Sequence, residues 1–453
     1  SDLVMKNILI LGAGKSATVL IDYLLDHANA LNATVTLGDL DVNIAQQKLK
    51  NHASGKAVYF NSEDAVIREN CIQQADIVVS LLPAFLHPVV AADCVKFKKH
   101  FVSASYVGEA MQSLHQAAVD AGIILLNEIG LDPGIDHMSA KKMIDEVIAA
   151  GGEITGFESY TGGLIAPESD NNPWNYKFTW NPRNVVLAGQ GTAKFLQNHD
   201  YKYIPYQKLY ERYDILDIPG YGQFEGYPNR DSLAYRKIYG LENTATIVRG
   251  TLRKRGFCDA WNVFVQLGMT DDTYIMENAQ RFTKSMFTKA FIPGISNDVK
   301  SGLINYLKIT DPENINKLVW LGLFDESPIF TETALNKEFT PAQILQFILE
   351  QKWSLDAGDK DMCVMKHVMD YTQNGKSYTL HSNMVAIGQD EIYTAMAKTV
   401  GLPAAIATKM ILTGEIHKTG VVIPVTADIY NPVLDELANQ HKIQFTETLI
   451  ANE

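Results

Sequence analysis

Short apolar runs alternate with amphipathic segments along the first part of the chain. The apolar runs lie at residues 6–11, 34–37, 57–60, 77–82, 101–103 and 123–126. Segments with helical spacing separate them, at residues 17–31, 42–51, 63–73, 88–98 and 110–121. Strands that alternate with helices of this length are typical of a parallel sheet covered on both faces. The pattern therefore predicts an α/β fold with a Rossmann-type, doubly wound parallel sheet.

The pattern changes after a helix-like segment at residues 138–150. A strand-like run at 154–161 leads into long tyrosine-rich extended stretches. Residues 261–350 are mainly of helical spacing, which predicts a helical insertion. Two alternating runs, 362–371 and 377–387, flank Asn374 and Gly375, and this pair of residues is a strong hairpin signal. The tail predicts one more helix at 432–439 and a strand at 443–446.

The bulk properties limit the possible partners. The chain has 453 residues, of which 46% are hydrophobic, and it carries a formal charge of −13. Two or three domains with ample core are expected at this length. The negative charge would repel nucleic acid and anionic membranes, so neither is expected as a partner. A small anionic substrate is compatible with it, because a local arginine clamp can override the global sign.

The four cysteines, Cys71, Cys94, Cys258 and Cys363, are scattered without C-x-x-C spacing. They indicate neither a disulfide framework nor a metal site, so we expect no metal and a reducing, cytoplasmic setting. No apolar run is expected to approach the length needed to span a bilayer. The first residues also lack the basic and apolar sections of a signal peptide.

A glycine-rich turn follows the first apolar run. Gly12, Ala13, Gly14, Lys15 and Ser16 begin a G-x-G-x-x-G/A pattern that Ala17 completes. The first glycine permits a tight turn, the second lets the backbone approach a pyrophosphate, and the small third residue lets the helix pack on the strand. The turn therefore predicts a dinucleotide site.

The second predicted strand ends at Gly38 and Asp39, at the distance where such folds place an acidic residue. A carboxylate there accepts hydrogen bonds from a ribose hydroxyl and repels a 2′-phosphate. Asp39 therefore predicts NAD as cofactor, with NADP less favoured. The alternative interpretation of Asp39 is a solvated acid in a turn.

The stretch from Asn127 to His137 stands where the dinucleotide pattern stops. The chain must turn sharply there, because Pro133 lacks an N–H group and Gly134 tolerates unusual backbone angles. Asp132 would lie at the carboxyl end of a strand, where open α/β sheets bind ligands. We interpret Asp132 as a residue that lies where the cofactor and the substrate meet. Its alternative role is an Asx turn or a helix N-cap.

These motifs, taken in order, give the chain a family likeness. It resembles saccharopine dehydrogenase of the glutamate-forming type, also called saccharopine reductase, over essentially its full length. The matching stretches are ASY at 104–106, NEIGLDPGIDH at 127–137, SY at 159–160, GGL at 162–164, APE at 166–168, YKF at 176–178, YPNRDS at 227–232, RGTLR at 249–253 and AMAKTVG at 395–401.

The resemblance implies an enzyme of lysine metabolism that oxidises the secondary amine of saccharopine to an imine. Water then splits the imine into glutamate and 2-aminoadipate 6-semialdehyde. It also implies a homodimer with three domains. These are a dinucleotide domain at 1–131 with a C-terminal return at about 415–453, an α/β substrate and dimerisation domain at 132–265 and 351–414, and a helical domain at 266–350.

The resemblance also implies site residues. Those implied to contact substrate are Ser105, Tyr106, Asp132, Arg230, Thr251, Leu252 and Arg253. Those implied to contact the cofactor, beside the glycine turn and Asp39, are Asn61, Ser62, Leu82, Ala104, Ser105, Leu131, Asp132, Pro133 and Asn181.

Three positions depart from the family. Asp39 stands where the fungal biosynthetic enzymes carry an arginine, which favours NAD-driven breakdown, as in the animal enzyme. Thr161 replaces a cysteine beside the substrate, and Ala84 replaces a common tyrosine near the nicotinamide. Any role of that cysteine thiol is therefore absent here, and the alanine changes how the substrate would be positioned.

The expected substrate is a tricarboxylate, and arginine grips carboxylates bidentately. Arg230 and Arg253 are the clamp candidates, and the alternative for each is a solvated basic face. Lys177, Tyr106 and Asp132 are candidates for acid–base catalysis. None of the three has the sequence signature of a tuned pair, so the base stays unassigned.

Two other functions fit parts of the pattern. A carboxynorspermidine or homospermidine synthase-like enzyme would also act on secondary amines, but it would need fewer carboxylate clamps. A non-catalytic NAD-binding regulator would bind the cofactor without turnover. Turnover with saccharopine separates both from the main hypothesis.

Overall fold

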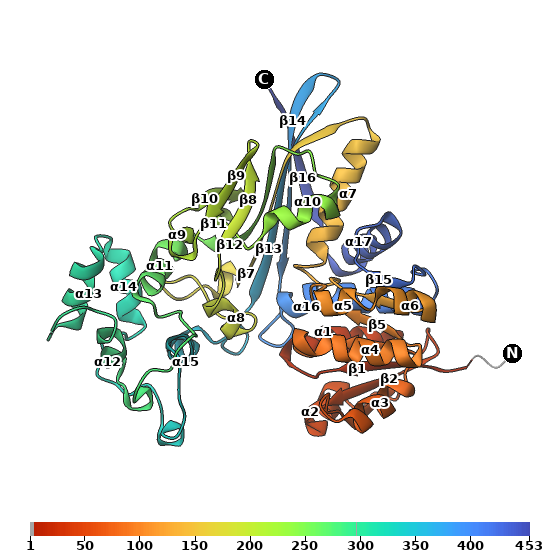
Figure 1. Cartoon of the computed structure of the whole chain (residues 1–453), viewed down its shortest axis with the longest axis horizontal. Helices are drawn as coiled ribbons and strands as arrows, with labels where there is room; N and C mark the ends of the chain where they lie inside the picture. Colours follow the sequence, from red (N-terminus) through yellow and green to blue (C-terminus); the bar gives the residue numbers. More distant parts are fainter. Residues whose placement is uncertain (1–3, 296) are drawn as a thin grey trace. The chain divides into compact units, whose positions relative to one another are not determined.

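The computed structural model describes residues 4–295 and 297–453. The chain forms two compact units. The first unit comprises Ser1–Glu153 and Met384–Thr446, and the second comprises Ile154–Asn383 and Glu447–Glu453. Each unit is built around its own sheet (Figure 1).

The sheet of the first unit has the order β15-β6-β5-β4-β1-β2-β3, and its neighbours pair in parallel. Its strands are β1 (Lys6–Leu11), β2 (Ala33–Asp39), β3 (Gly55–Tyr59), β4 (Ile77–Ser80), β5 (His100–Ser103), β6 (Ile124–Leu126) and β15 (Gly420–Val422). The strand order reverses between β1 and β4, and open α/β sheets bind ligands outside the carboxyl ends of strands at such a reversal. The predicted doubly wound parallel sheet is confirmed.

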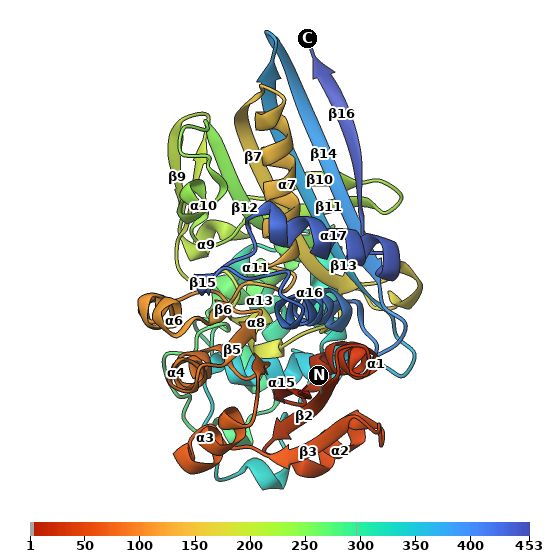
Figure 2. The same cartoon turned by 90° about the vertical axis from the view of Figure 1, so that its right-hand side faces the viewer.

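Helices cover both faces of this sheet, which explains why β1, β4 and β6 read as continuous apolar runs. Figure 2 shows α1 and α2 on one side, and α3, α4 and α6 on the other. The helices are α1 (Thr18–His27), α2 (Val42–Leu49), α3 (Ala65–Gln73), α4 (His87–Phe97), α5 (Glu109–Gln112), α6 (His115–Ala121), α7 (Ile135–Ala149), α16 (Ala395–Leu412) and α17 (Ala427–His441). Side chains of Asp41 and Asp64 cap α2 and α3 by accepting backbone N–H groups. The helix predicted at 110–121 is divided into α5 and α6.

Helix α16 is the core helix of the first unit. It packs against α1, where a Cβ atom at Gly401 would lie 3.2 Å from Leu20 Cβ. Within the part of the chain described, it is the helix that is long and apolar enough to cross a membrane, with a mean hydropathy of 1.2. The expectation that no run reaches that length is therefore wrong. However, 72% of the helix is buried inside the protein, so core packing accounts for its composition.

The sheet of the second unit is mixed, with the order β10-β11-β12-β7-β13-β14-β16 and with β8 and β9 attached to β12. Its strands are β7 (Glu153–Ile165), β8 (Ala193–Gln197), β9 (Asp200–Ile204), β10 (Asp214–Ile218), β11 (Gly222–Pro228), β12 (Thr246–Lys254), β13 (Asp361–Gln373), β14 (Lys376–Ile387) and β16 (Phe445–Asn452). The predicted hairpin turn lies between β13 and β14, with positive φ at both Asn374 and Gly375.

The predicted helical insertion is confirmed. The helices of the second unit are α8 (Pro182–Val186), α9 (Tyr206–Leu209), α10 (Tyr235–Tyr239), α11 (Phe257–Leu267), α12 (Lys284–Lys289), α13 (Val299–Leu307), α14 (Pro312–Trp320) and α15 (Pro341–Trp353). Short 3-10 turns are η1 (Lys15–Ala17), η2 (Ala84–Leu86), η3 (Pro167–Ser169), η4 (Ser232–Ala234), η5 (Ala279–Arg281) and η6 (Glu332–Ala334). Thr340 and Gln343 form a capping box at the start of α15.

The compact units differ from the predicted domain edges. The first unit extends to Glu153 and resumes at Met384, whereas edges at 131 and about 415 were predicted. Two helices make the difference: α7 packs against α17, and α16 packs against α1. The sequence pattern shows where a helix begins, but it does not show which sheet the helix covers.

The turn between β6 and α7 contains an unusually close backbone approach. Gly134 has φ of +148°, and a Cβ atom there would lie 2.0 Å from Gly130 O. A Cβ atom at Gly130 would lie 2.8 Å from Ala104 Cβ. The N–H group of Gly130 donates to Pro133 O at 2.9 Å, and that of Ile135 donates to Gly130 O at 2.8 Å. Only glycine fits either position, and the crossing fixes the course of the chain around Asp132.

We expect Gly134→Ala to lower the free energy of unfolding by about 3 kcal/mol or more, because backbone would have to move to admit the methyl group. The matched control is Gly151→Ala, where φ is +90° and no described atom lies within 4 Å of the new Cβ position. The control should cost only about 1 kcal/mol. Urea unfolding followed by circular dichroism measures both, and equal losses would contradict the close-approach argument.

Candidate active site

The glycine turn after β1 has the shape of a phosphate cradle. Gly12 has φ of +101°, and a Cβ atom there would lie 3.1 Å from Leu81 O, so only glycine fits. At Gly14 no described atom lies within 4 Å of the Cβ position, so the space beside the backbone is open. Lys15 and Ser16 are exposed at the start of η1. The turn can therefore bring backbone N–H groups against a pyrophosphate.

Asp39 holds this turn in place. Its Oδ2 accepts the N–H group of Ala13 at 2.8 Å, and its Oδ1 accepts the N–H group of Asp41 at 2.8 Å. Gly12 N also donates to Gly38 O at 2.8 Å. The end of β2 is thus tied to the glycine turn by backbone and side chain. Each carboxylate oxygen of Asp39 therefore already accepts a hydrogen bond from a backbone N–H group.

Other predicted cofactor residues lie at the same edge of the sheet, where β3, β4 and β5 end. Asn61 Oδ1 accepts the N–H group of Glu63 at 3.0 Å, and Ser62 O accepts Arg68 Nη1 at 2.6 Å. Leu82 follows β4 and Ala104 follows β5, and both are half-buried. The structure therefore brings the first-unit cofactor candidates to one edge.

Tyr106 and Asp132 are brought together at this edge. The phenol of Tyr106 donates to Asp132 Oδ1 at 3.1 Å, and both residues are exposed. The N-cap of α7 is Gly134, so Asp132 is not that cap. Its neighbours Leu131 and Pro133 are buried. A carboxylate and a phenol in contact, both open to solvent, can hold and pass a proton.

A buried pair of side chains, Glu128 and His137, lies next to the segment that carries Tyr106. Glu128 Oε1 lies 2.9 Å from His137 Nε2, and both side chains are buried. Glu128 N donates to Ser105 O at 3.1 Å. Val107 N donates to Glu128 Oε2 at 3.4 Å. Glu128 thus holds the backbone on both sides of Tyr106. Glu128 was not among the predicted site residues, although it lies in the stretch from Asn127 to His137.

The second unit contains a buried cation. Arg253 is 3% exposed, and its Nη1 donates to Leu252 O at 3.4 Å. Its guanidinium lies 5.5 Å from the ring of Tyr176 and 5.3 Å from that of Phe257. In residues 4–295 and 297–453, no acceptor is placed for its Nε. The facing carboxylate, Glu225, already binds Arg255 Nη1 and the N–H groups of Gly256 and Cys258.

Two buried phenols beside Arg253, those of Tyr176 and Tyr227, make no hydrogen bond of good geometry among the described residues, although Trp180 lies near the first and Tyr210 and Thr251 lie near the second. Burial raises the pKa of both phenols, which keeps them protonated. Burial by itself lowers the pKa of Arg253, but Tyr227, Tyr176 and Tyr210 outweigh it, so the net pKa lies above its ordinary value. We call Arg253, Tyr176 and Tyr227 the arginine–tyrosine cluster. It offers a positive charge and unused donors, which suits an anion.

The remaining second-unit candidates are spread out. Arg230 is exposed in the loop after β11, has φ of +53°, and accepts Lys194 N at its carbonyl. Thr251 lies opposite Tyr227 in the β11–β12 pairing and is half-buried, whereas Leu252 is fully buried. Asn181 Oδ1 caps α8 by accepting Arg183 N. Within the described residues, no hydrogen bond or ring contact links Arg230 to the arginine–tyrosine cluster.

Lys177 has carboxylate partners of its own. Its Nζ lies 2.6 Å from Asp359 Oδ2 and 3.4 Å from Asp356 Oδ2, and its side chain is 3% exposed. Two carboxylates therefore already occupy the ammonium group of Lys177. The geometry therefore favours a structural role for Lys177 over that of a general base.

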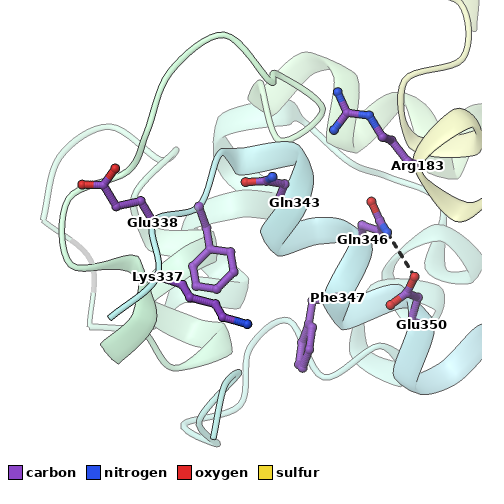
Figure 3. Close-up of a pocket in the computed structure, with 8 residues that line it drawn as sticks. Arg183, Lys337, Glu338, Gln343, Gln346, Phe347 and Glu350 are labelled. Carbon is purple, nitrogen blue, oxygen red and sulfur yellow. Dashed lines mark hydrogen bonds between the residues drawn. The ribbon is translucent and has the colours of Figure 1, made fainter. Parts of the chain in front are cut away.

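A hollow of about 570 Å³ lies in the helical part of the second unit (Figure 3). Its lining combines charged, amide and aromatic side chains: Arg183, Lys337, Glu338, Phe339, Gln343, Gln346, Phe347 and Glu350. No predicted site residue lines it. In the described parts of the chain, no group of three His, Cys, Asp or Glu side chains is placed to hold a metal.

The doubly wound sheet and its glycine cradle define a dinucleotide-binding protein. A family model described as the saccharopine dehydrogenase NADP binding domain matches residues 8–126, and one described as the saccharopine dehydrogenase C-terminal domain matches residues 130–443. The chain belongs to the saccharopine dehydrogenase family.

Three relatives illustrate the likeness. The chain is 34% identical to saccharopine dehydrogenase [NADP(+), L-glutamate-forming] of Schizosaccharomyces pombe, over 99% of this chain and 100% of the relative. It is 33% identical to the mitochondrial alpha-aminoadipic semialdehyde synthase of Rattus norvegicus, over 98% of this chain and 48% of that protein. A solved structure of apo saccharopine dehydrogenase (L-Glu forming) from Saccharomyces cerevisiae matches 98% of this chain and 100% of that one, with a TM-score of 0.88 and 33% identity.

The expected preference for NAD over NADP is wrong. The matching domain model is described as NADP-binding, and fungal relatives are named as NADP(+) enzymes. The prediction treated Asp39 as a free carboxylate facing the ribose. In the structure Asp39 binds the N–H groups of Ala13 and Asp41, so its position is explained by anchoring the glycine turn.

If Lys177 is structural, Lys177→Met should destabilise the protein by about 3–5 kcal/mol, because Asp359 would stay buried without its cation. Pairing it with Asp359→Asn should recover part of the loss. Thermal unfolding measures both variants, and turnover is compared below their melting temperatures. A loss of turnover of more than about 100-fold with unchanged stability would identify Lys177 as an acid–base group instead.

Proposed function

We propose that this chain interconverts saccharopine with L-glutamate and 2-aminoadipate 6-semialdehyde, as an L-glutamate-forming saccharopine dehydrogenase. Family membership over nearly the whole chain supports the reaction. The structural observation that carries the proposal is the arginine–tyrosine cluster. A buried cation with unused donors costs free energy unless an anion completes it, and saccharopine carries carboxylates.

The cofactor in this proposal is NADP(H), as in the names of the fungal relatives. The open cradle at Gly14 fits a pyrophosphate, and the exposed Lys15 adds a positive charge at that edge. When bound, the nicotinamide supplies the acceptor or donor of a hydride at the carbon beside the substrate nitrogen. The protein's part is to align the two molecules and to handle charge and protons.

Each set of residues has a separate task. Arg253 binds a substrate carboxylate, with Tyr176 and Tyr227 donating to its oxygens, and Arg230 binds a second carboxylate from its exposed loop. In the first unit, Asp132 and Tyr106 form a pair that can attract an ammonium group and exchange a proton with an amine. Glu128 keeps Ser105 and Tyr106 in position. The anion-binding cluster favours this substrate over a polyamine.

We also propose a cytoplasmic homodimer without nucleic-acid or membrane partners. The free cysteines support a reducing compartment, and the formal charge of −13 opposes binding to polyanions. The edge strand β16 exposes Leu449 and Ile450, at 54% and 46%, which suits contact with a second copy.

The first test is turnover. Purified protein mixed with saccharopine and NADP should form the reduced cofactor, followed by its absorbance, and glutamate should accumulate in equal amount. The rate with NAD is the comparison. No turnover with either cofactor would contradict the proposed enzyme, whereas faster turnover with NAD would contradict only the cofactor assignment.

The second test is Arg253→Met. We expect the KM for saccharopine to rise by about 100-fold, because a carboxylate would lose its charged partner. The free energy of unfolding without ligand should stay within about 1 kcal/mol of the wild-type value or rise, because the variant lacks a buried charge that has no counterion. Arg236→Met, at a half-buried position beside Tyr201, is the control and should leave KM unchanged. Destabilisation with unchanged KM would show that Arg253 is purely structural.

A further inference from the structure

Exposed apolar side chains stand on either side of the glycine turn. Leu40, directly after β2, is 67% exposed, and Phe85, in η2 after β4, is 80% exposed. β1, which carries the glycine turn, lies between β2 and β4 in the sheet. Both residues therefore sit at the carboxyl edge where the strand order reverses. Large side chains as exposed as Phe85 call for an explanation when they gather at a ligand-binding edge.

The segment that carries Phe85 is fixed at both ends. Leu81 N donates to Leu11 O at 2.8 Å, next to the glycine turn, and Leu86 N donates to Pro83 O at 3.0 Å. Leu82 packs against the core of the sheet. His87 is buried, with its ring edge-on to Phe101 at a centroid distance of 5.8 Å. The exposure of Phe85 is therefore set by an anchored turn.

A dinucleotide has two heterocyclic bases joined through its pyrophosphate. With the phosphates at the glycine turn, the two halves of the molecule extend along the carboxyl edge on either side of β1. Aromatic side chains stack on heterocyclic bases, since both have flat π faces. In the turn from Leu81 to Leu86, Phe85 is the aromatic residue. A base placed against it would remove its exposed ring from water.

We propose that Phe85 is a cofactor-positioning residue that packs against a base of the bound dinucleotide, with Leu40 as an apolar contact across the glycine turn. This inference rests on the proposed function, because it assumes a dinucleotide in the cradle. It adds a residue that the family resemblance did not assign. Phe85 acts by holding the cofactor, so its loss affects cofactor binding before it affects the substrate.

The test measures binding without turnover. NADPH is titrated into the full-length protein and its fluorescence is followed, and 2′,5′-ADP, which lacks the nicotinamide, is titrated in competition. We expect Phe85→Ala to weaken NADPH binding by about tenfold. If Phe85→Ala weakens the binding of 2′,5′-ADP equally, Phe85 contacts the adenine. If the affinity for 2′,5′-ADP is unchanged, Phe85 contacts the nicotinamide. The control is Val66→Ala on α3, which is 69% exposed in the same unit and should change neither affinity.

A second variant guards against a folding defect. Phe85→Trp keeps an aromatic ring and should retain NADPH affinity within about twofold. Its indole should also transfer excitation energy to bound NADPH more strongly than the wild-type protein does. Unchanged NADPH affinity in Phe85→Ala, with normal binding by the wild type, would overturn this inference alone. Absence of NADPH binding by the wild type would instead count against the proposed function.

Discussion

The candidate site in the first unit depends on one backbone crossing. Gly134 approaches the backbone of Gly130 so closely that it cannot carry a side chain, and Ala104 leaves no room for one at Gly130. The chain between the two glycines presents Asp132 at the edge of the sheet. Helix α7 begins at the same turn, and its residue His137 forms a hydrogen bond with Glu128. Glu128 in turn bonds to the backbone of Ser105 and Val107, on either side of Tyr106. Cofactor edge and proton-handling pair are thus positioned by one piece of rigid backbone rather than by mobile side chains.

The fold could be predicted from the sequence because both faces of the first sheet are covered. Strands such as β1, β4 and β6 read as continuous apolar runs, and the intervening helices follow in order. Strand β15 was not predicted, because it has three residues and joins β6 from almost 300 positions later in the chain. The compact units also differ from the predicted domains, since the sequence does not show that α7 and α16 pack with the first sheet.

The candidate site could be predicted in its residue types but not in their partners. Asp39 was recognised at the end of β2, yet its bonds to Ala13 and Asp41 became visible only in three dimensions. Lys177 looked available as a base until its partner Asp359, 182 positions away, was in place. The unused donors of the arginine–tyrosine cluster leave no trace in the sequence, because burial without a partner is a property of packing.

The hydrogen bonds of Glu225 affect how the stability of the second unit depends on a bound anion. Its carboxylate faces Arg253 across the β11–β12 pairing, but it is occupied by Arg255 and two backbone amides. Among the described residues, no carboxylate is therefore placed to pair with the buried charge of Arg253. If an anion binds there, as proposed, binding and folding are linked, and the complex is expected to unfold at a higher temperature than the protein alone. An esterified or amidated analogue of the same size would protect it far less, which makes charge, more than shape, the basis of selection.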